Sequence, residues 1–334
     1  MLLDANDQGG EYGNALQAAS AGGHEKLAQM LLDAGALVNT QKGDYGSALH
    51  AASWSGAVQV VQMLLDAGAD VNIQGGKYGN ALQAASWSGD EEVVQMLLDA
   101  GADVNLQGGE YGNALQAASA DGDVNVVQML LDAGADIHVQ GGIFGNALQA
   151  ASWSGDEEVV QMLLDAGADV NVQGGIFGNA LQAASAGGHE KVVQMLRNAG
   201  ADVNLQGGKH GNALQAASWR GDVKMVQMLL NANADVSVQG GIFGNALQAA
   251  SWSGDEEVVQ MLLDANADVN VQGGFFGNAL QAASAGGYEE VVQMLLDAGA
   301  DVNLQGGYYG SALHAASWSG AVKVVQMLLD AGAD

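Results

Sequence analysis

The chain has 334 residues and a formal net charge of -29, because 38 Asp and Glu stand against 9 Lys and Arg. A field of this sign repels phosphate groups, so nucleic acid and anionic membranes are not expected partners, whereas a basic protein partner is compatible with it. Cysteine is absent, which excludes disulfides, thiolate metal sites and a cysteine nucleophile.

The sequence also lacks the features of a membrane or secreted protein. No apolar run approaches the ~18 residues that span a bilayer, and Asp4 interrupts the N-terminal stretch where a signal peptide has its apolar core. We therefore predict a cytoplasmic or otherwise intracellular protein.

One phrase recurs through the whole chain. The leucine of its NALQ or SALH box occurs ten times at a constant spacing, at Leu16, Leu49, Leu82, Leu115, Leu148, Leu181, Leu214, Leu247, Leu280 and Leu313. A fixed period of this size indicates stacked units, none of which buries its apolar face alone. With 49% hydrophobic but 5% aromatic residues, the shared core is predicted to be aliphatic and rich in alanine.

The two ends of the chain interrupt this pattern. Met1–Asn6 matches the end of the second helix of a repeat, and Asp334 lies within the phrase GADVN. Neither end has a polar capping repeat, which solenoids usually need. We predict a single array over residues 1–334, with ten repeats and partial units at both ends, that is a fragment of a longer protein.

The first half of a repeat predicts a turn and a short helix. In the repeat that starts at Gly75, the pair Gly75-Gly76 forms the turn, because glycine tolerates positive φ. Asn80 is the predicted N-cap of a helix over about Ala81–Ser88, and Gly89 ends that helix.

The second half predicts a longer helix. Asp90–Glu92 places carboxylates at its start, where the helix dipole favours them, and Val93–Leu98 supplies a broad apolar face. Gly101 is predicted to end this helix in the left-handed conformation. Asn233 and Asn266 replace this glycine in two repeats, and asparagine is the usual second choice for that conformation.

This order of turn, short helix, turn, longer helix and a GADVN link resembles the ankyrin repeat. The family's T-P-L-H box is present as Asn80–Gln83, and as Ser47–His50 and Ser311–His314. Asn or Ser can still cap the helix, and Gln can still donate a hydrogen bond between repeats. The resemblance implies an all-α repeat solenoid, an ankyrin-like stack of ten 33-residue helix-turn-helix units with β-turn or hairpin fingers.

The wording of the repeats carries a narrower resemblance. The phrase GGxYGNALQAAS followed by VVQMLLDAGADVN is similar to the ankyrin repeat arrays of fungal NOD-like, nucleotide-binding and signal-transducing receptors. The residue after each AAS phrase reads Ala, Trp, Trp, Ala, Trp, and then the same five-letter order again. This order is consistent with a duplicated block of five repeats.

Two positions of the repeat vary, namely the fingertip and the residue after the AAS phrase at the end of the first helix. Both are expected to line the concave face. The fingertips read Glu11, Asp44, Lys77, Glu110, Ile143, Ile176, Lys209, Ile242, Phe275 and Tyr308. Beside each fingertip stands a ring, for example Tyr78 or Phe243, which is predicted to pack on the neighbouring finger.

The predicted partner-binding residues come from these variable positions. A position that accepts both Ala and Trp is not tightly packed, so its indoles are expected to reach open space, where exposed aromatic residues favour binding. The predicted set is Trp54, Trp87, Trp153, Trp219, Trp252 and Trp318 with the apolar fingertips Ile143, Ile176, Ile242, Phe275 and Tyr308.

Motifs for chemistry are weak throughout the chain. The GGxYG turns lack the spacing of a phosphate loop and the lysine that follows one. Carboxylates such as Asp66 and Asp70 have equivalents in most repeats, but equivalent carboxylates lie one repeat apart, too far from each other to share a calcium ion. His24 has no second metal ligand nearby. We predict no catalytic residue, no metal site, no cofactor and no enzyme activity.

One substitution is predicted to weaken the core. Arg197 replaces the second leucine of the LL pair found in most repeats, as in Leu97-Leu98. A charge that faces the core costs several kcal/mol unless it reaches solvent, so Arg197→Leu is expected to stabilise the array.

The combined prediction is a protein-interaction module that binds a peptide or a folded protein partner in its concave groove. Two alternatives stay open. The array is the ligand-sensing segment of a larger signalling ATPase whose catalytic part lies upstream of Met1, or it is a non-binding structural spacer. The sequence carries no feature that sets an oligomeric state.

Overall fold

The computed structural model describes residues 12–334, which form twenty α-helices in ten consecutive pairs. Within this range, β-structure is limited to isolated antiparallel bridges such as that between Gly75 and Gly79. The predicted all-α stack of helical repeats with hairpin fingers is therefore confirmed. Met1–Asn6 and the first fingertip, Glu11, lie outside the described residues.

The chain divides into two compact units, Met1–Asp169 and Val170–Asp334. Unit 1 contains α1 (Ala15–Ala21), α2 (Glu25–Asp33), α3 (Ala48–Trp54), α4 (Val58–Asp66), α5 (Ala81–Ser88), α6 (Glu91–Asp99), α7 (Ala114–Asp121), α8 (Val124–Asp132), α9 (Ala147–Ser154) and α10 (Glu157–Asp165). Unit 2 contains α11 (Ala180–Gly187), α12 (Glu190–Asn198), α13 (Ala213–Arg220), α14 (Val223–Asn231), α15 (Ala246–Ser253), α16 (Glu256–Asp264), α17 (Ala279–Gly286), α18 (Glu289–Asp297), α19 (Ala312–Ser319) and α20 (Val322–Asp330). One continuous array over residues 1–334 stays a prediction.

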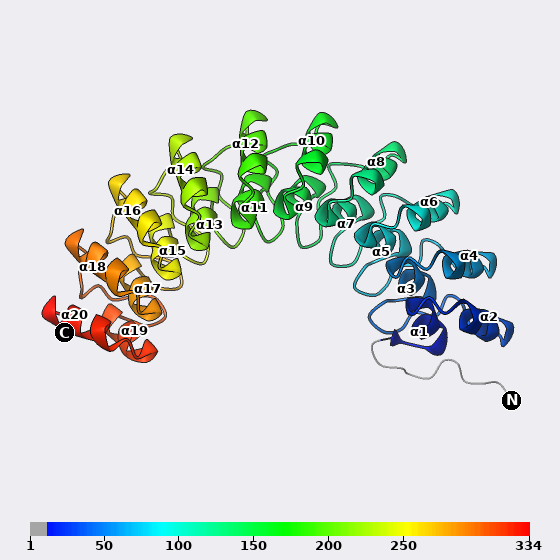
Figure 1. Ribbon diagram of the computed structural model, residues 1–334, viewed down its shortest axis with the longest axis horizontal. Coiled ribbons are helices and arrows are strands. Elements are labelled where there is room, and N and C mark those ends of the chain that lie inside the picture. Colours follow the sequence, from blue (N-terminus) through cyan, green and yellow to red (C-terminus); the bar gives the residue numbers. More distant parts are fainter. Residues whose placement is uncertain (1–11) are drawn as a thin grey trace. The chain divides into compact units, whose positions relative to one another are not determined.

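Within each unit the helices form two rows (Figure 1). The odd-numbered first helices pack closely on one another, as α5 does on α7 and α13 on α15, and each also packs on the even-numbered helix of its own repeat. The even-numbered helices contact one another less. The first helices therefore carry most of the contact between neighbouring repeats.

The predicted first helix is confirmed in the repeat that starts at Gly75. The side chain of Asn80 accepts a hydrogen bond from the backbone N–H of Gln83 at 2.8 Å, and the helix covers Ala81–Ser88. It ends at Gly89, which has a left-handed φ of 69°.

The predicted second helix is confirmed in the same way. Asp90 caps it by accepting a hydrogen bond from the N–H of Val93 at 2.9 Å. Gly101 follows the helix with a φ of 85°. Among the described residues, Asn233 and Asn266 are the non-glycine residues with positive φ, both at 63°, as their place in the repeat predicts.

The core is built from small aliphatic side chains, as the composition predicts. Ala84 and Ala85 on α5 and Val93, Val94 and Leu97 on α6 are completely buried. Alanine on the first helices lets neighbouring backbones approach closely, while the larger valine and leucine side chains fill the space between the two rows.

Buried glutamines connect neighbouring repeats. Nε2 of Gln215 donates to the backbone oxygens of Val238 at 3.1 Å and of Gly244 at 3.0 Å, both in the next repeat. The predicted hydrogen bond of glutamine between repeats is thereby confirmed. The same bonds recur in other repeats, for example from Gln83 to Leu106 and Gly112.

The fingers are connected through their backbones. The N–H of Ile242 donates to the carbonyl of Lys209 at 2.8 Å, that of Phe275 to Ile242 at 2.7 Å, and that of Tyr308 to Phe275 at 2.8 Å. These backbone bonds hold successive fingertips of unit 2 in register and leave their side chains exposed.

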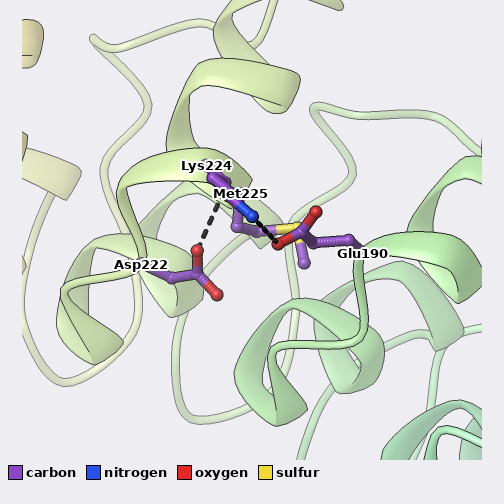
Figure 2. A network of polar contacts seen from close by, with 4 residues as sticks. All are labelled: Glu190, Asp222, Lys224 and Met225. Atoms are coloured by element: carbon purple, nitrogen blue, oxygen red, sulfur yellow. Dashed lines mark hydrogen bonds and ion pairs between the residues drawn. The ribbon is translucent and has the colours of Figure 1, made fainter.

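Polar contacts between the second helices lie at the surface. Figure 2 shows Lys224 on α14 reaching Glu190 on α12, with 3.7 Å between Nζ and Oε1. Asp222 caps α14 by accepting from the N–H of Met225 at 3.0 Å. An exposed ion pair of this kind contributes less than ~1 kcal/mol, so it adds little to the stability of the stack.

The prediction that Arg197 faces the core is wrong. Leu196, the first residue of the pair, is completely buried, whereas the second position is half-buried for Arg197 and for leucines such as Leu98 and Leu164. Arg197 also lies in the last turn of α12, where the helix dipole favours a positive charge.

We expect Gln215→Met to lower the free energy of unfolding by about 1–3 kcal/mol, because it removes the donor for two carbonyls of the next repeat. Urea denaturation measures the change. Gln227→Met is the matched control, since Gln227 is exposed and bonds only to Asn231 of its own helix among the described residues. Equal losses in the two variants would contradict a role for Gln215 between repeats.

We expect Arg197→Leu to change the free energy of unfolding by less than about 1 kcal/mol, as at other partly exposed sites. Leu196→Ala, one residue earlier, should cost about 2–5 kcal/mol because it empties a fully buried position. A stabilisation of several kcal/mol by Arg197→Leu would show that the arginine is buried after all.

Candidate functional site

The rings beside the fingertips stack on one another within each unit. These finger rings are Tyr12, Tyr45, Tyr78, Tyr111 and Phe144 in unit 1, and Phe177, His210, Phe243, Phe276 and Tyr309 in unit 2. The centroids of Tyr78 and Tyr111 are 6.4 Å apart, and those of Phe243 and Phe276 are 6.5 Å apart with an interplanar angle of 11°. For these pairs, the prediction that the ring packs on the neighbouring finger is confirmed.

The tryptophans lie on top of these rings. Trp87 stacks on Tyr111 with centroids 4.2 Å apart. Trp252 stacks in the same way on Phe276, at 4.3 Å. In each pair the tryptophan of one repeat contacts the finger ring of the next repeat along the chain.

The prediction that the indoles reach open space holds only in part. Trp153, Trp219 and Trp318 are exposed, whereas Trp54, Trp87 and Trp252 are half-buried. In the pairs Trp87–Tyr111 and Trp252–Phe276, the finger ring covers one face of the indole. Sequence reasoning missed the contacts of Trp87 with Tyr111 and of Trp252 with Phe276 because the partners stand in different repeats.

The apolar fingertips are exposed, as predicted. Ile143 lies on unit 1, and Ile176, Ile242, Phe275 and Tyr308 lie on unit 2. The rings of Phe275 and Tyr308 stack at 4.9 Å, so two successive fingers present one aromatic surface. In each unit, we call the fingertips, the finger rings and the Trp/Ala positions together the finger face.

A pocket of 510 Å³ opens in the finger face of unit 2. It is lined by Trp219, Gly241, Ile242, Phe243, Trp252, Gly274, Phe275 and Phe276. Four predicted binding residues thus come together, namely Trp219, Ile242, Trp252 and Phe275, while the other predicted residues lie elsewhere on the two finger faces. The volume lies in the range of ~300–1,000 Å³ typical of ligand clefts.

The floor of this pocket consists of finger rings that sequence reasoning left out of the site. Trp219 lies 6.2 Å from Phe243, and Trp252 lies 4.3 Å from Phe276. The finger rings therefore hold neighbouring fingers together and also form the base on which a ligand would rest.

Two positive residues that adjoin lining residues of the pocket along the backbone were also missed. The carbonyl of Lys209 accepts a hydrogen bond from the N–H of Ile242, and Arg220 follows Trp219. Lys209 is an exposed fingertip, and Arg220 directly follows Trp219 at the end of α13. Nη1 of Arg220 donates to the backbone oxygen of Ala186 at 3.4 Å. Comparison of the two halves of the sequence, offset by five repeats, would have revealed both, since Asp44 and Ser55 stand at the corresponding positions.

His210 takes the place of a finger ring in unit 2. It is buried, with its ring centroid 5.0 Å from that of Trp219 and 6.2 Å from that of Phe243. Burial, with a smaller contribution from the charge of Lys209, lowers the pKa of His210 to about 4. The imidazole is therefore neutral in the folded protein near pH 7.

Over residues 12–334, no cluster of three or more His, Asp or Glu side chains is arranged to hold a metal ion. In the same part of the chain, no helix is both long and apolar enough to cross a bilayer. His50 forms the capping box of α3 together with Ser47, as its place in the SALH box predicts.

Comparison with known proteins identifies the repeats. A family model of ankyrin repeats, which describes three copies, matches residues 1–75, 81–174, 148–240, 180–273 and 246–334. A stretch of 31 residues is 77% identical to the azaphilone pigments biosynthesis cluster protein L of Monascus ruber. That match covers 9% of this chain and 7% of the length of the relative.

We expect the stability of the chain to depend on His210 below pH 6.5. The unfolded chain binds a proton near pH 6.5 and the folded chain only near pH 4, so stability is lost as pH falls between these values. At pH 5 the loss is about 2 kcal/mol, from ~1.4 kcal/mol per pKa unit. His210→Phe should lack this part of the loss when the free energies of unfolding at pH 7.5 and pH 5 are compared.

The converse variant provides the control. Phe243→His places a second imidazole among the finger rings and should add a similar loss on acidification. If the parent and His210→Phe lose the same free energy between pH 7.5 and pH 5, His210 does not titrate differently in the folded chain.

Proposed function

The chain belongs to the ankyrin repeat family, and we propose that it is an intracellular protein-interaction module whose finger face binds a peptide or a folded protein. Ankyrin repeat proteins are typically binding modules without enzyme activity. The proposal adds a location on the molecule, the finger face, and names the side chains that make contact.

The observation that carries the proposal is where the repeats differ. The buried Val-Val pair of the second helix, as in α6 and α10, recurs in most repeats, whereas the fingertip changes from Lys77 in one repeat to Ile242 and Phe275 in others. Variation at exposed positions on a rigid frame is what a recognition surface needs. Exposed aromatic residues in such a surface are favoured contributors to binding energy.

The predicted partner is a protein or peptide rather than nucleic acid or membrane. The net charge of -29 disfavours phosphate-rich partners. It attracts basic proteins at long range, so a basic partner stays part of the proposal for the finger face as a whole. The local charges within that face differ between the two units, as described below.

A second candidate function rests on the wording of the repeats. Their phrase is similar to arrays of fungal NOD-like receptors, in which the chain would be the ligand-sensing segment of a larger signalling ATPase. The genomic sequence upstream of Met1 tests this candidate. A nucleotide-binding box in the same reading frame would support it, and an in-frame stop codon would exclude it.

Selection from a random peptide display library tests the main proposal. The full chain is the bait, and a variant with all six tryptophans replaced by alanine is the counter-bait. We expect recovered peptides to bind the parent and not the variant. Recovery of peptides that bind both equally would contradict a binding role for the tryptophans, and recovery of none would favour a structural spacer.

Single variants give the expected magnitudes. Trp219→Ala and Trp252→Ala should each lower the free energy of unfolding by about 1 kcal/mol, because Trp219 contacts the rings of His210 and Phe243 and Trp252 stacks on Phe276. Each should weaken a selected peptide by about tenfold, as for aromatic residues at the centre of an interface. Isothermal titration and urea denaturation measure the two effects, and unfolding of either variant would show that the indoles belong to the core.

A further inference from the structure

The two units carry the same pair of tryptophans in differently lined surroundings. Trp54 and Trp87 in unit 1 correspond to Trp219 and Trp252 in unit 2, five repeats later. The fingertips next to these pairs differ completely. Lys77 and Glu110 stand in unit 1 where Ile242 and Phe275 stand in unit 2. The chain thus holds an internal comparison for what the fingertips contribute.

In unit 2 these fingertips form two walls of an apolar pocket. Ile242 and Phe275 are each 49% exposed and line the pocket together with the indoles of Trp219 and Trp252. Its floor is made of the rings of Phe243 and Phe276. Every side chain of the lining is apolar or aromatic, so a large apolar side chain fits the 510 Å³ space best.

In unit 1 the corresponding fingertips bring charges to the same place. Nζ of Lys77 lies 4.8 Å from the centroid of the Tyr78 ring, the counterpart of Phe243. The ammonium group makes a cation–π contact with this ring and keeps water molecules close to the ring. Burial of an apolar side chain there would require removing this charge from water, so the unit 2 pair is the favoured apolar site.

The side chains beside the two tryptophan pairs differ in charge. Lys209 in unit 2 stands where Asp44 stands in unit 1, and Arg220 stands where Ser55 stands. Lys209 adjoins His210, whose ring contacts Trp219 at 5.0 Å, and Arg220 is the residue after Trp219. Within the described part of the chain, neither Lys209 nor Arg220 forms an ion pair with a carboxylate.

We infer that the unit 2 pocket receives an aromatic or large aliphatic side chain of a partner peptide, and that a carboxylate next to this side chain pairs with Lys209 or Arg220. This inference rests on the proposed function and names its partner. Charge-assisted hydrogen bonds from lysine or arginine to a carboxylate are stronger than neutral ones, so the acidic group adds specificity to the apolar anchor.

The strong negative charge of the whole chain does not oppose this local preference. At physiological ionic strength, charges more than ~8 Å apart are largely screened from each other. Lys209 and Arg220 therefore set the preference at the pocket together with the carboxylates nearest to them, of which Asp222 and Asp255 lie beside Gly221, while more distant carboxylates mainly influence the rate of encounter. A lower affinity for the acidic peptide at low ionic strength is a consequence.

Fluorine NMR of the full chain with 5-fluorotryptophan tests the inference. Each of the six resonances is assigned by a Trp→Phe variant. The probes are three acetylated and amidated peptides, GSGEWEGSG, GSGKWKGSG and GSGEAEGSG. We expect GSGEWEGSG to shift the resonances of Trp219 and Trp252 but not those of Trp54 and Trp87. It should bind about tenfold more tightly than GSGKWKGSG, a difference typical of one charged contact, and GSGEAEGSG should cause no shift.

Exchanges between the units separate the apolar and the charged contributions. Ile242→Lys with Phe275→Glu copies the unit 1 fingertips into unit 2 and should abolish the shifts. Lys209→Asp with Arg220→Ser should keep binding of the tryptophan but remove the preference for GSGEWEGSG. All four positions are exposed, and circular dichroism verifies that the fold is kept.

The transplant into unit 1 is the gain-of-function arm. Lys77→Ile and Glu110→Phe, combined with Asp44→Lys and Ser55→Arg, should make the resonances of Trp54 and Trp87 respond to GSGEWEGSG. These four positions are likewise exposed.

Two results would overturn the inference. One is equal binding of the acidic and basic peptides at Trp219 and Trp252, and the other is an equal response of Trp54 and Trp87 in the parent chain. If display-selected peptides still bind at other tryptophans of the finger face, the proposed function stands and this inference fails. If no peptide of any kind binds the finger face, both fail.

Discussion

The close approach of neighbouring first helices is the constraint on which the rest of the structure depends. Completely buried alanines such as Ala84 and Ala85 allow this approach, because a larger side chain at either position would overfill the interface. At that separation a glutamine such as Gln215 reaches two carbonyls of the next repeat, and within a unit a fingertip N–H such as that of Ile242 reaches the carbonyl of the fingertip before it. The spacing of the fingers therefore follows from the small side chains of the helices.

Because the fingers are regularly spaced, their rings stack and form a surface. Successive rings stack in both units, with centroids 6.4 Å apart for Tyr78 and Tyr111 and 6.5 Å apart for Phe243 and Phe276. Tryptophans then stack on the rings from the end of the first helix, as Trp252 does on Phe276. One set of aromatic side chains thus stabilises the fingers and supplies the base of the candidate binding surface. Substitutions of the indoles are consequently expected to affect both stability and binding.

The fingertips are free to change because their structural role is carried by the backbone. Ile242, Lys77 and Glu110 all make the same N–H to carbonyl bond to the preceding finger, although their side chains differ in charge and polarity. Selection can therefore alter the lining of the surface without altering the frame. The apolar pocket beside Lys209 and Arg220 in unit 2, and the charged fingertips of unit 1, are two outcomes of this freedom.

The sequence by itself determined the repeat, the helix boundaries and the left-handed positions, including Asn233 and Asn266, because caps, glycines and apolar spacing act within a few residues of one another. It also identified the positions at which the repeats vary. Only the tertiary structure decided where the side chains at those positions lie. Trp219 and Phe243 belong to different repeats yet lie 6.2 Å apart in space, and the half-buried site of Arg197 depends on how the second helices pack. Such contacts arise between repeats, and their distances are set by the packing of the alanine-rich helices, which no local pattern encodes.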